Sequence, residues 1–279
     1  GGMVVKYSGL AAGKGVFICR TPGAALDALK KIEARHGADA PVVVEELLEG
    51  PEVSVMGLTD GRTIQLLPPS RDHKRLLDGD RGPNTGGMGA YTPVPDVDAA
   101  TMAEIHRTII APTLAGLAKD GIEYRGFLYF GLMLTAAGPK LLEYNARLGD
   151  PETEVLLPAL DGDLLAPILA CFDGTLEKHP LAARPGAVLD VVLAAGGYPG
   201  DIRKGDPITG IEQADALVFH TGTAIQNGQL VTSGGRVLNV VAHGADLESA
   251  RRKVYAACGK IHFEGMQYRT DIGQGRASA

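Results

Sequence analysis

Residues 141–147 read Leu-Leu-Glu-Tyr-Asn-Ala-Arg, and this stretch says most about the fold and the chemistry of the chain. Side chains alternate along a strand, so Glu143, Asn145 and Arg147 share one face while Leu142 and Tyr144 share the other. A carboxylate beside an amide oxygen is a hard oxygen pair that suits Mg²⁺, which takes one or two protein carboxylates plus substrate phosphates. Arg147 suits a phosphoryl group in transit. The stretch predicts a metal and phosphate site; a solvated polar face is the alternative.

A glycine-rich segment near the start predicts a second phosphate contact. Lys6 precedes Gly-Leu-Ala-Ala-Gly-Lys-Gly at residues 9–15, in which the lysine is Lys14. A P-loop has four residues between its glycines and a Ser or Thr after the lysine, whereas this segment has three residues and then Gly15. A glycine-rich hairpin still lets backbone N–H groups cover a polyphosphate while lysines neutralise it. A glycine turn with a solvated lysine is the alternative.

Carboxylates end the next apolar run. Residues 42–48 read Val-Val-Val-Glu-Glu-Leu-Leu, which predicts a strand that ends in Glu45, Glu46 and Leu48, and Glu52 follows shortly after. Backbone groups at such a strand end can meet an adenine edge, and Glu52 is placed to bind ribose hydroxyls. Carboxylates at a strand end are usually solvated, so this interpretation depends on the other parts of a nucleotide site.

Residues 68–95 show no apolar periodicity, and we expect them to form a long loop, which in a compact domain is often functional. Five charged residues lie between Arg71 and Asp78, and Asn-Thr-Gly-Gly-Met-Gly occupies residues 84–89. Glycines admit close backbone approach, and the mixed charges suit an anionic substrate that carries an amine. A solvated face is the alternative for the charge run. His73 has no metal-ligand spacing and is expected to be structural or solvated.

Periodicity and turn residues predict an α+β chain. Helices are expected from Thr21-Pro22 to Gly37, over 98–119 with a kink or division at Pro112, over 153–172 with breaks, and over 247–259. Strands are expected at 4–6, 16–18, 42–48, 53–58, 63–67, 126–135, 140–145, 188–194, 216–220, 229–232 and 237–242. A polar stretch at 181–186 indicates a domain boundary.

Composition narrows the function. Of 279 residues, 38 are glycine, and they cluster near residues 9–15, 79–89 and 196–210 without a fibrous repeat. A net charge of −6 disfavours general nucleic-acid binding, which needs a basic surface. Three scattered cysteines argue against a disulfide framework and favour a cytoplasmic protein, and no apolar run is long enough to span a membrane. Gly1-Gly2-Met3 lacks signal-peptide character and is typical of the cut edge of a larger protein.

Several segments together resemble the phosphoribosylamine–glycine ligase (glycinamide ribonucleotide synthetase) family of ATP-grasp enzymes. The resemblance lies in residues 4–16, 72–75, 82–91, 143–152, 197–200, 220–223, 234–238 and 268–273. It implies an ATP-grasp fold, with two α+β lobes around a nucleotide cleft, followed by a small, mostly β C-terminal domain with one helix. The implied domains are a partial nucleotide-binding lobe at 1–55, a central domain with metal and substrate loops at 56–185, and the C-terminal domain at 186–279.

The resemblance also implies a role for each candidate residue. Lys6 and Lys14 would contact ATP phosphates, Glu45, Glu46 and Leu48 would form the adenine hinge, and Glu52 would hold the ribose. Glu143 and Asn145 would ligate Mg²⁺ or Mn²⁺, and Arg147 and Lys74 would act in catalysis. Asp72, Asn84 and Asp150 are assigned to the substrate from their loop positions.

In that family, ATP phosphorylates the carboxylate of glycine, and the amine of 5-phosphoribosylamine attacks the acyl phosphate in a step of purine biosynthesis. Two departures are visible: Ser8 stands where family members often have Asp, and the family's N-terminal domain has no counterpart here. We expect that domain to be supplied in cis or in trans. The alternatives are an ATP-grasp ligase for another acceptor and a non-catalytic fragment.

Overall fold

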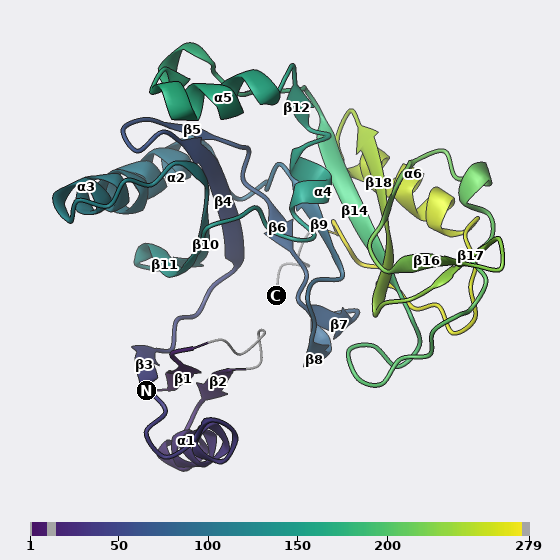
Figure 1. The fold of residues 1–279 in the computed structure, drawn as a ribbon, viewed down its shortest axis with the longest axis horizontal. Coiled ribbons are helices and arrows are strands. Elements are labelled where there is room, and N and C mark those ends of the chain that lie inside the picture. Colours follow the sequence, from purple (N-terminus) through teal and green to yellow (C-terminus); the bar gives the residue numbers. More distant parts are fainter. Residues whose placement is uncertain (1, 10–14, 275–279) are drawn as a thin grey trace. The chain divides into compact units, whose positions relative to one another are not determined.

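The structure is a computed structural model that describes residues 2–9 and 15–274. The chain forms two compact units, Gly1–Pro51 and Glu52–Ala279 (Figure 1). The first unit is an antiparallel sheet in which β1 (Met3–Tyr7) lies between β2 (Val16–Cys19) and β3 (Val42–Glu46). These strands confirm the sequence prediction, except that β3 ends at Glu46 and leaves Leu48 beyond it.

Helix α1 (Pro22–His36) covers one face of this sheet. Thr21 caps it, because the hydroxyl of Thr21 accepts a hydrogen bond from the N–H of Ala24, and Pro22 sits in the first turn where no N–H is needed. Gly37 ends the helix with a φ of 95°. The predicted helix is therefore confirmed, with Val5 and Ile32 buried between helix and sheet.

The second unit contains a four-stranded antiparallel sheet with the order β11-β10-β4-β5. Its strands are β4 (Glu52–Thr59), β5 (Ile64–Leu66), β10 (Gly126–Thr135) and β11 (Gly138–Asn145). A helical segment packs on one face and consists of α2 (Ala99–Ile105), a π-helical turn (His106–Ile110) and α3 (Ala111–Lys119). The π turn divides the helix just before Pro112. The proline therefore falls in the first turn of α3, where its missing N–H interrupts no α-helical hydrogen bond of α3.

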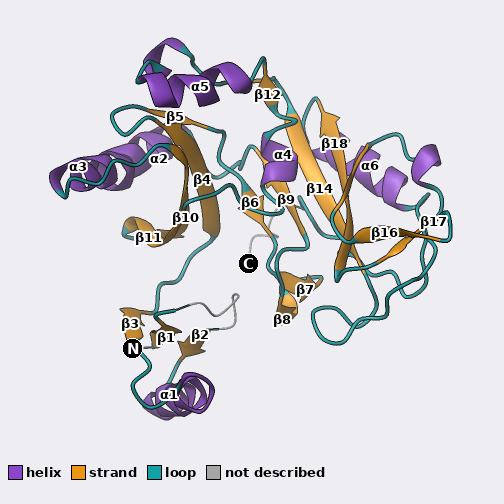
Figure 2. Cartoon of the chain, viewed as in Figure 1, coloured by secondary structure: helices purple, strands orange, loops and turns teal. Residues whose placement is uncertain are grey.

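A five-stranded sheet has the order β15-β18-β14-β9-β6. It consists of β6 (Arg71–Asp72), β9 (Gly89–Thr92), β14 (Ala187–Ala194), β15 (Leu217–His220) and β18 (Arg236–Gly244), and α6 (Leu247–Cys258) packs on β14 and β18 (Figure 2). The expectation of one long loop at 68–95 is wrong, because β6 and β9 join this sheet. Such short strands are placed by ladder partners far away in the chain, so they carry no periodicity of their own.

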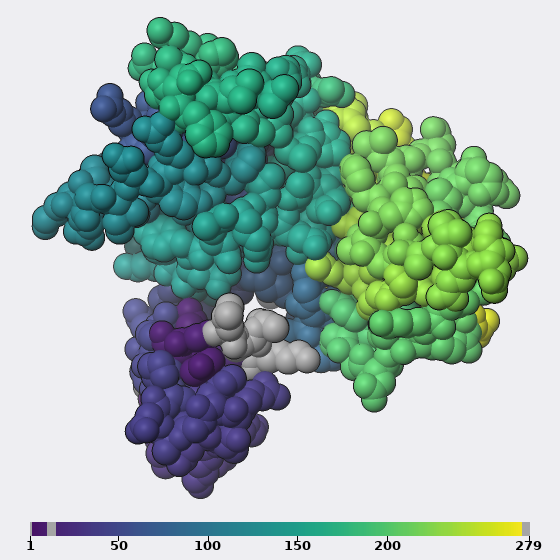
Figure 3. Space-filling view, viewed as in Figure 1, coloured from purple at the N-terminus to yellow at the C-terminus, as the bar shows by residue number. Residues whose placement is uncertain are grey.

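Shorter elements complete the second unit. They are β7 (Arg75–Leu77), β8 (Arg81–Asn84), β12 (Leu160–Asp161), β13 (Ala182–Ala183), β16 (Thr223–Gln226), β17 (Gln229–Thr232), α4 (Thr153–Leu156), α5 (Leu165–Asp173) and the 3₁₀ turns Leu176–Lys178 and Ile211–Gln213. Figure 3 shows the residues after 186, in green and yellow, abutting the teal residues before them. One buried cluster runs from Val53 through Leu189 to Val254. A separate domain at 186–279 stays a proposal, and both the five-stranded sheet and this core cross its proposed boundary.

Two observations bear on the expectations drawn from composition. The thiols of Cys19, Cys171 and Cys258 are all free and buried. Within residues 2–9 and 15–274, no helix combines the length and the apolar character needed to cross a membrane.

The substitution Gly89→Ala tests the junction of β9 with β14. Gly89 has a φ of 145°, and an added Cβ would lie 2.4 Å from the backbone oxygen of Asp190. We expect a loss of about 2 kcal/mol or more in the free energy of unfolding, measured by urea denaturation. Gly116→Ala in α3 is the matched control, because nothing lies within 4 Å of its added Cβ, and it should be neutral or mildly stabilising. Equal stability of the two variants would contradict this packing.

Candidate active site

In the first unit, Lys6 and Glu45 lie on the sheet face opposite α1, whereas Glu46 pairs with Met3 on the α1 side and Leu48 lies beyond β3. The cross-strand register pairs Lys6 with Val16 and with Val43, and it pairs Val4 with Ile18 and with Glu45, so all six side chains share this face. Lys6 Nζ lies 2.6 Å from Glu45 Oε2. Ile18 is 58% exposed. The face thus presents an apolar surface beside a charged pair, an arrangement that can take a flat base and an attached phosphate. Lys14 lies outside the described residues.

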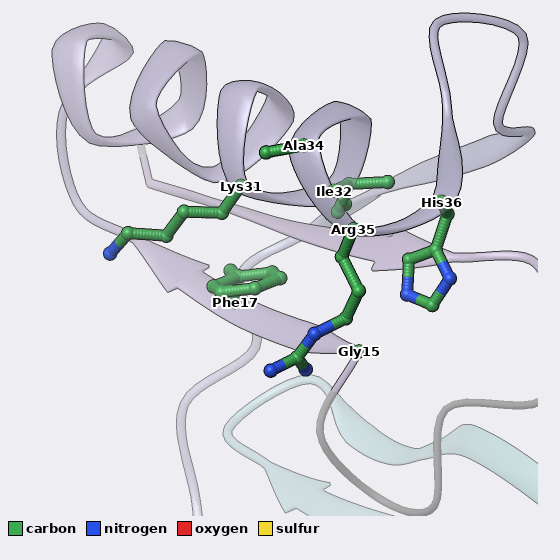
Figure 4. A pocket seen from close by; sticks show the side chains of 7 residues that line it. All are labelled: Gly15, Phe17, Lys31, Ile32, Ala34, Arg35 and His36. Carbon is green, nitrogen blue, oxygen red and sulfur yellow. The ribbon is translucent and has the colours of Figure 1, made fainter.

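A hollow of about 640 Å³ opens on the other side of the same sheet. Figure 4 shows Lys31 and Arg35 extending from α1 near the ring of Phe17 on β2. Phe17 pairs with Val5, which faces the helix, so this hollow is not the surface that carries Lys6. Lys6 and Glu45 are therefore separate from the hollow, which Gly15 of the glycine-rich segment helps to line.

In the second unit, the register of the four-stranded sheet brings predicted residues together. Gly131 of β10 pairs with Ser54 of β4 and with Glu143 of β11, and Tyr129 pairs with Asn145. Because directly opposed residues point to the same face, Ser54, Tyr129, Glu143 and Asn145 share one face, and Glu52 joins them two positions along β4. We call this the polar face. The opposite face buries Val53, Val55 and Phe130 in the core.

Glu143 and Asn145 can hold a divalent cation on the polar face. Asn145 Nδ2 donates to Glu143 Oε1 at 3.2 Å, so the amide oxygen of Asn145 and the second carboxylate oxygen remain available as hard ligands. Among the described residues no group of three His, Cys, Asp or Glu side chains is arranged for a metal. The pair fits Mg²⁺ or Mn²⁺ whose other ligands are phosphates and water. Arg147 follows β11, is exposed, and donates to the carbonyl of Leu148.

A buried hydrogen-bond network supports the polar face from below. Glu152 is only 3% exposed, and its Oε1 accepts hydrogen bonds from Ser54 Oγ at 2.8 Å and from Tyr129 OH at 3.2 Å. The two hydroxyl oxygens lie 2.8 Å apart, so one hydroxyl shares its single proton between the other hydroxyl and Glu152. Burial raises the pKa of Tyr129, so the phenol stays a hydrogen-bond donor. The network ties β4, β10 and the start of α4 into one rigid support.

Lys74 and Glu52 form a charged pair at the edge of this face. Lys74 Nζ lies 2.5 Å from Glu52 Oε2, so the structure joins the residue proposed for ribose to one proposed for catalysis. Although burial opposes its charge, the carboxylates of Asp72 and Glu52 raise the pKa of Lys74. Burial raises the pKa of Asp72 to about 7. The positive charge of Lys74 lowers this pKa, and the negative charges of Glu152 and Glu52 raise it further. Burial lowers the pKa of His73 to about 4, so this histidine is neutral at pH 7.

The glycine-rich loop at 84–89 is held by side chains from the C-terminal part of the second unit. Arg236 of β18 donates to the carbonyl of Gly86 at 2.8 Å and pairs with Asp150 at 2.8 Å. The N–H of Gly86 donates to the hydroxyl of Tyr198 at 2.9 Å. Asn84, the first residue of the loop, ends β8 and is exposed. Of the proposed substrate residues, Asp150 is therefore tied to the loop through Arg236, whereas Asn84 pairs with Arg75 of β7.

The sequence interpretation missed Ser54, Tyr129, Glu152, Tyr198 and Arg236. Glu152 ends the segment 143–152 that carries the family resemblance, and Arg236 directly follows Gly234 and Gly235. Neither position in the sequence indicates which side chains these residues contact in the fold. Ser54 and Tyr129 are 75 residues apart, and only the register of β4 with β10 brings them together.

Comparison with known proteins places this geometry in a family. Residues 1–153 match the family described as "Phosphoribosylglycinamide synthetase, ATP-grasp (A) domain", and residues 188–275 match its C domain. The chain is 48% identical, over 97% of its length and 64% of the relative's, to the phosphoribosylamine–glycine ligase of Rhodopirellula baltica. It is also 48% identical to the human trifunctional purine biosynthetic protein adenosine-3, of which it covers 28%.

Solved structures agree with the sequence comparison. The crystal structure of phosphoribosylamine–glycine ligase from Thermotoga maritima matches with a TM-score of 0.85 and 44% identity, over 96% of this chain and 68% of that one. A biotin carboxylase from Campylobacter jejuni has a TM-score of 0.67 at 14% identity, a likeness that concerns the fold alone. The chain spans just under two thirds of the length of the Rhodopirellula baltica relative. It has the ATP-grasp fold, as expected, and it belongs to the phosphoribosylglycinamide synthetase family.

Proposed function

We propose that this chain is the ATP-binding and C-terminal part of an ATP-dependent ligase that joins glycine to 5-phosphoribosylamine. The observation that carries the proposal is the polar face, where Glu143 and Asn145 lie beside Glu52 and Lys74. Family membership supplies the substrates. ATP transfers its γ-phosphoryl group to the glycine carboxylate, releasing ADP, and the amine of phosphoribosylamine displaces phosphate from glycyl phosphate to give glycinamide ribonucleotide.

The residues of the first unit suit ATP. Lys6 can meet the negative charge of a phosphate, and the exposed apolar side chains beside it can cover a base. Lys14 would add a second cation, and Glu45, Glu46 and Leu48 would meet the adenine edge. A bound base would desolvate the pair of Lys6 and Glu45 and strengthen its electrostatics.

The residues of the second unit suit the charges that develop during transfer. Glu143 and Asn145 would hold Mg²⁺ or Mn²⁺, which neutralises phosphate charge when bound. Arg147 is exposed beyond these two residues and can contact the transferred phosphoryl group, since its guanidinium recognises phosphate oxygens bidentately. Lys74, whose raised pKa keeps it protonated, would stabilise the same charge.

The acidic side chains suit an amine. Glu52 and Glu152 repel the charge of Asp72 while Lys74 attracts it, so a further ammonium group beside Asp72 would be held electrostatically. Asn84, at the start of the glycine-rich loop, and Asp150, which pairs with the same Arg236 that binds Gly86, would contact the phosphoribosyl portion. We place the reaction in the cytoplasm, because three free thiols are typical of a reducing compartment.

An assay of product formation tests the proposed activity. The chain would be incubated with ATP, Mg²⁺, glycine and 5-phosphoribosylamine, alone and together with the portion of the Rhodopirellula baltica ligase that it does not cover. We expect little product from the chain alone and glycinamide ribonucleotide from the mixture. Stoichiometric ADP release with another acceptor, such as bicarbonate, would favour a different ATP-grasp ligase. Absence of turnover in a mixture that binds ATP would contradict the proposal.

Glu143→Gln tests the metal pair. The neutral amide keeps the shape of the side chain but removes the charge that attracts a cation, so the affinity for Mg-ATP should fall at least about tenfold, while metal-free ATP binding changes little. Calorimetric titration with and without Mg²⁺ measures both. Glu248→Gln in α6 is the control for loss of an exposed carboxylate. Equal metal dependence in the wild type and in E143Q would rule out this ligand.

The raised pKa of Asp72 predicts a pH-dependent stability. The folded state binds this proton more tightly than the unfolded chain does, with a folded pKa of about 7 against 3.8, so the contribution of Asp72 to stability declines as the pH rises from about 4 to 7. Asp72→Asn should therefore gain stability relative to the wild type across that interval. Urea unfolding from pH 5 to 8 measures it, with Asp201→Asn as an exposed control. A constant or shrinking difference would contradict this assignment.

A further inference from the structure

We propose that Arg269 is a positioning residue for the candidate substrate loop: with Thr270 and Asp271 it clasps the β7–β8 hairpin and so fixes the backbone around Lys74 and Asn84. We call residues 269–271 the clasp. The geometry of the clasp stands independently of the proposed function. Only its kinetic consequence rests on that function, because Lys74 and Asn84 are proposed there to act on substrate.

Arg269 is a buried cation whose guanidinium nitrogens all donate hydrogen bonds to carboxylate or carbonyl oxygens. Its side chain is 1% exposed and is the largest fully buried side chain among the described residues. Nε and Nη2 each donate to a carboxylate oxygen of Asp271 at 2.7 Å. Nη1 donates to Asp80 Oδ1 at 2.8 Å and to the carbonyl oxygen of Arg75 at 3.1 Å. The planar guanidinium therefore joins the clasp to the start of β7 and to the β7–β8 turn, with a geometry that lysine cannot reproduce.

The other two residues of the clasp, Thr270 and Asp271, contact the tip of the same hairpin. Thr270 donates from its N–H to Asp78 Oδ1 at 2.8 Å, and its hydroxyl also donates to Asp78. The N–H of Gly79 donates to Asp271 Oδ2 at 2.8 Å. Asp80 adopts a φ of 53°, a backbone conformation that residues other than glycine rarely take. Each of the three clasp residues thus bonds to the strained turn at residues 78–80.

The hairpin transmits this position to the candidate substrate residues. Arg75, whose carbonyl accepts from Arg269, directly follows Lys74 and pairs in register with Asn84. Thr85 donates from its N–H and its hydroxyl to the carbonyl of Lys74, at 2.7 and 2.9 Å. Lys74, directly before β7, and Asn84, at the end of β8, therefore lie at the base of the hairpin, and the clasp holds the tip of the same hairpin.

Helix α6 anchors the clasp from its other side. The hydroxyl of Tyr255 donates to the carbonyl of Arg269 at 2.9 Å and accepts from the N–H of Ile272 at 3.0 Å. Arg251 Nη2 donates to the carbonyl of Thr270 at 2.8 Å. A clasp held by α6 on one side and bonded to the hairpin on the other can fix the position of the hairpin that carries Lys74 and Asn84.

The first test measures the environment of Lys74 and needs no activity. In the folded chain, acylation of lysines by a water-soluble active ester is followed by peptide mass spectrometry, with exposed Lys119 as the internal reference. In Arg269→Met the hairpin is released and Lys74 leaves its carboxylate partners, so its amine should deprotonate more readily. We expect acylation of Lys74 relative to Lys119 to rise at least about threefold, the effect of half a pKa unit.

Two variants keep this test decisive. Thr270→Val removes only the hydroxyl contact to Asp78 at an exposed position, so it should fold normally and show a smaller rise in the same direction. Arg203→Met is the matched control, because the ion pair of Arg203 joins it to Asp206 within the C-terminal part and not to the hairpin. An unchanged Lys74 signal in folded R269M, or in T270V if R269M does not fold, overturns the proposal.

The second test separates positioning from stability in the active mixture described above. Loss of the clasp should raise the KM for the amine substrate and leave the KM for ATP unchanged, whereas general destabilisation would lower the active fraction and leave both KM values as they are. Arg269→Lys restores the charge without the fork and should rescue only part of the effect. If the wild type itself shows no turnover, the proposed function fails while the labelling test still decides on the clasp.

Discussion

The register of three antiparallel strands is the constraint on which the rest of the second unit depends. In β4, β10 and β11 the directly opposed residues share a face, so one alignment places Val53, Val55 and Phe130 in the core and places Ser54, Tyr129, Glu143 and Asn145 on the polar face. A shift by one residue would exchange the two sets. The hydrophobic core therefore fixes the position of the chemical groups, since the free energy of burying the apolar face selects the register.

Buried polar groups give this frame its precision. Glu152 accepts from two hydroxyl groups, and Arg269 meets two carboxylates. Taking such groups out of water is costly, and only well-directed partners offset that cost. Each network links elements that are distant in the sequence, such as β4 with α4 and β7 with the segment after α6. These contacts restrict how far a substrate loop can move against the sheet.

The fold and the choice of substrate are determined at different places. A biotin carboxylase shares the fold at 14% identity, and a fold by itself does not specify a function. The loops carry that information. Residues 84–89 are held through Arg236 and Tyr198, and the β7–β8 hairpin is held through Arg269. Both restraints come from the C-terminal part of the chain, which gives that part a role in the arrangement of the candidate site as well as in folding.

Local sequence determined those elements whose signals are local. The cap at Thr21 and the stop at Gly37 bound α1, and alternation along residues 141–147 put Glu143 and Asn145 on one face. Tertiary structure alone decided that Lys74 pairs with Glu52, that β6 and β9 belong to a sheet completed by β18 (Arg236–Gly244), and that Arg269 reaches Asp80. The physical reason is range: periodicity and caps depend on neighbours within a few residues, whereas strand register and buried ion pairs depend on partners that only the folded chain brings into contact.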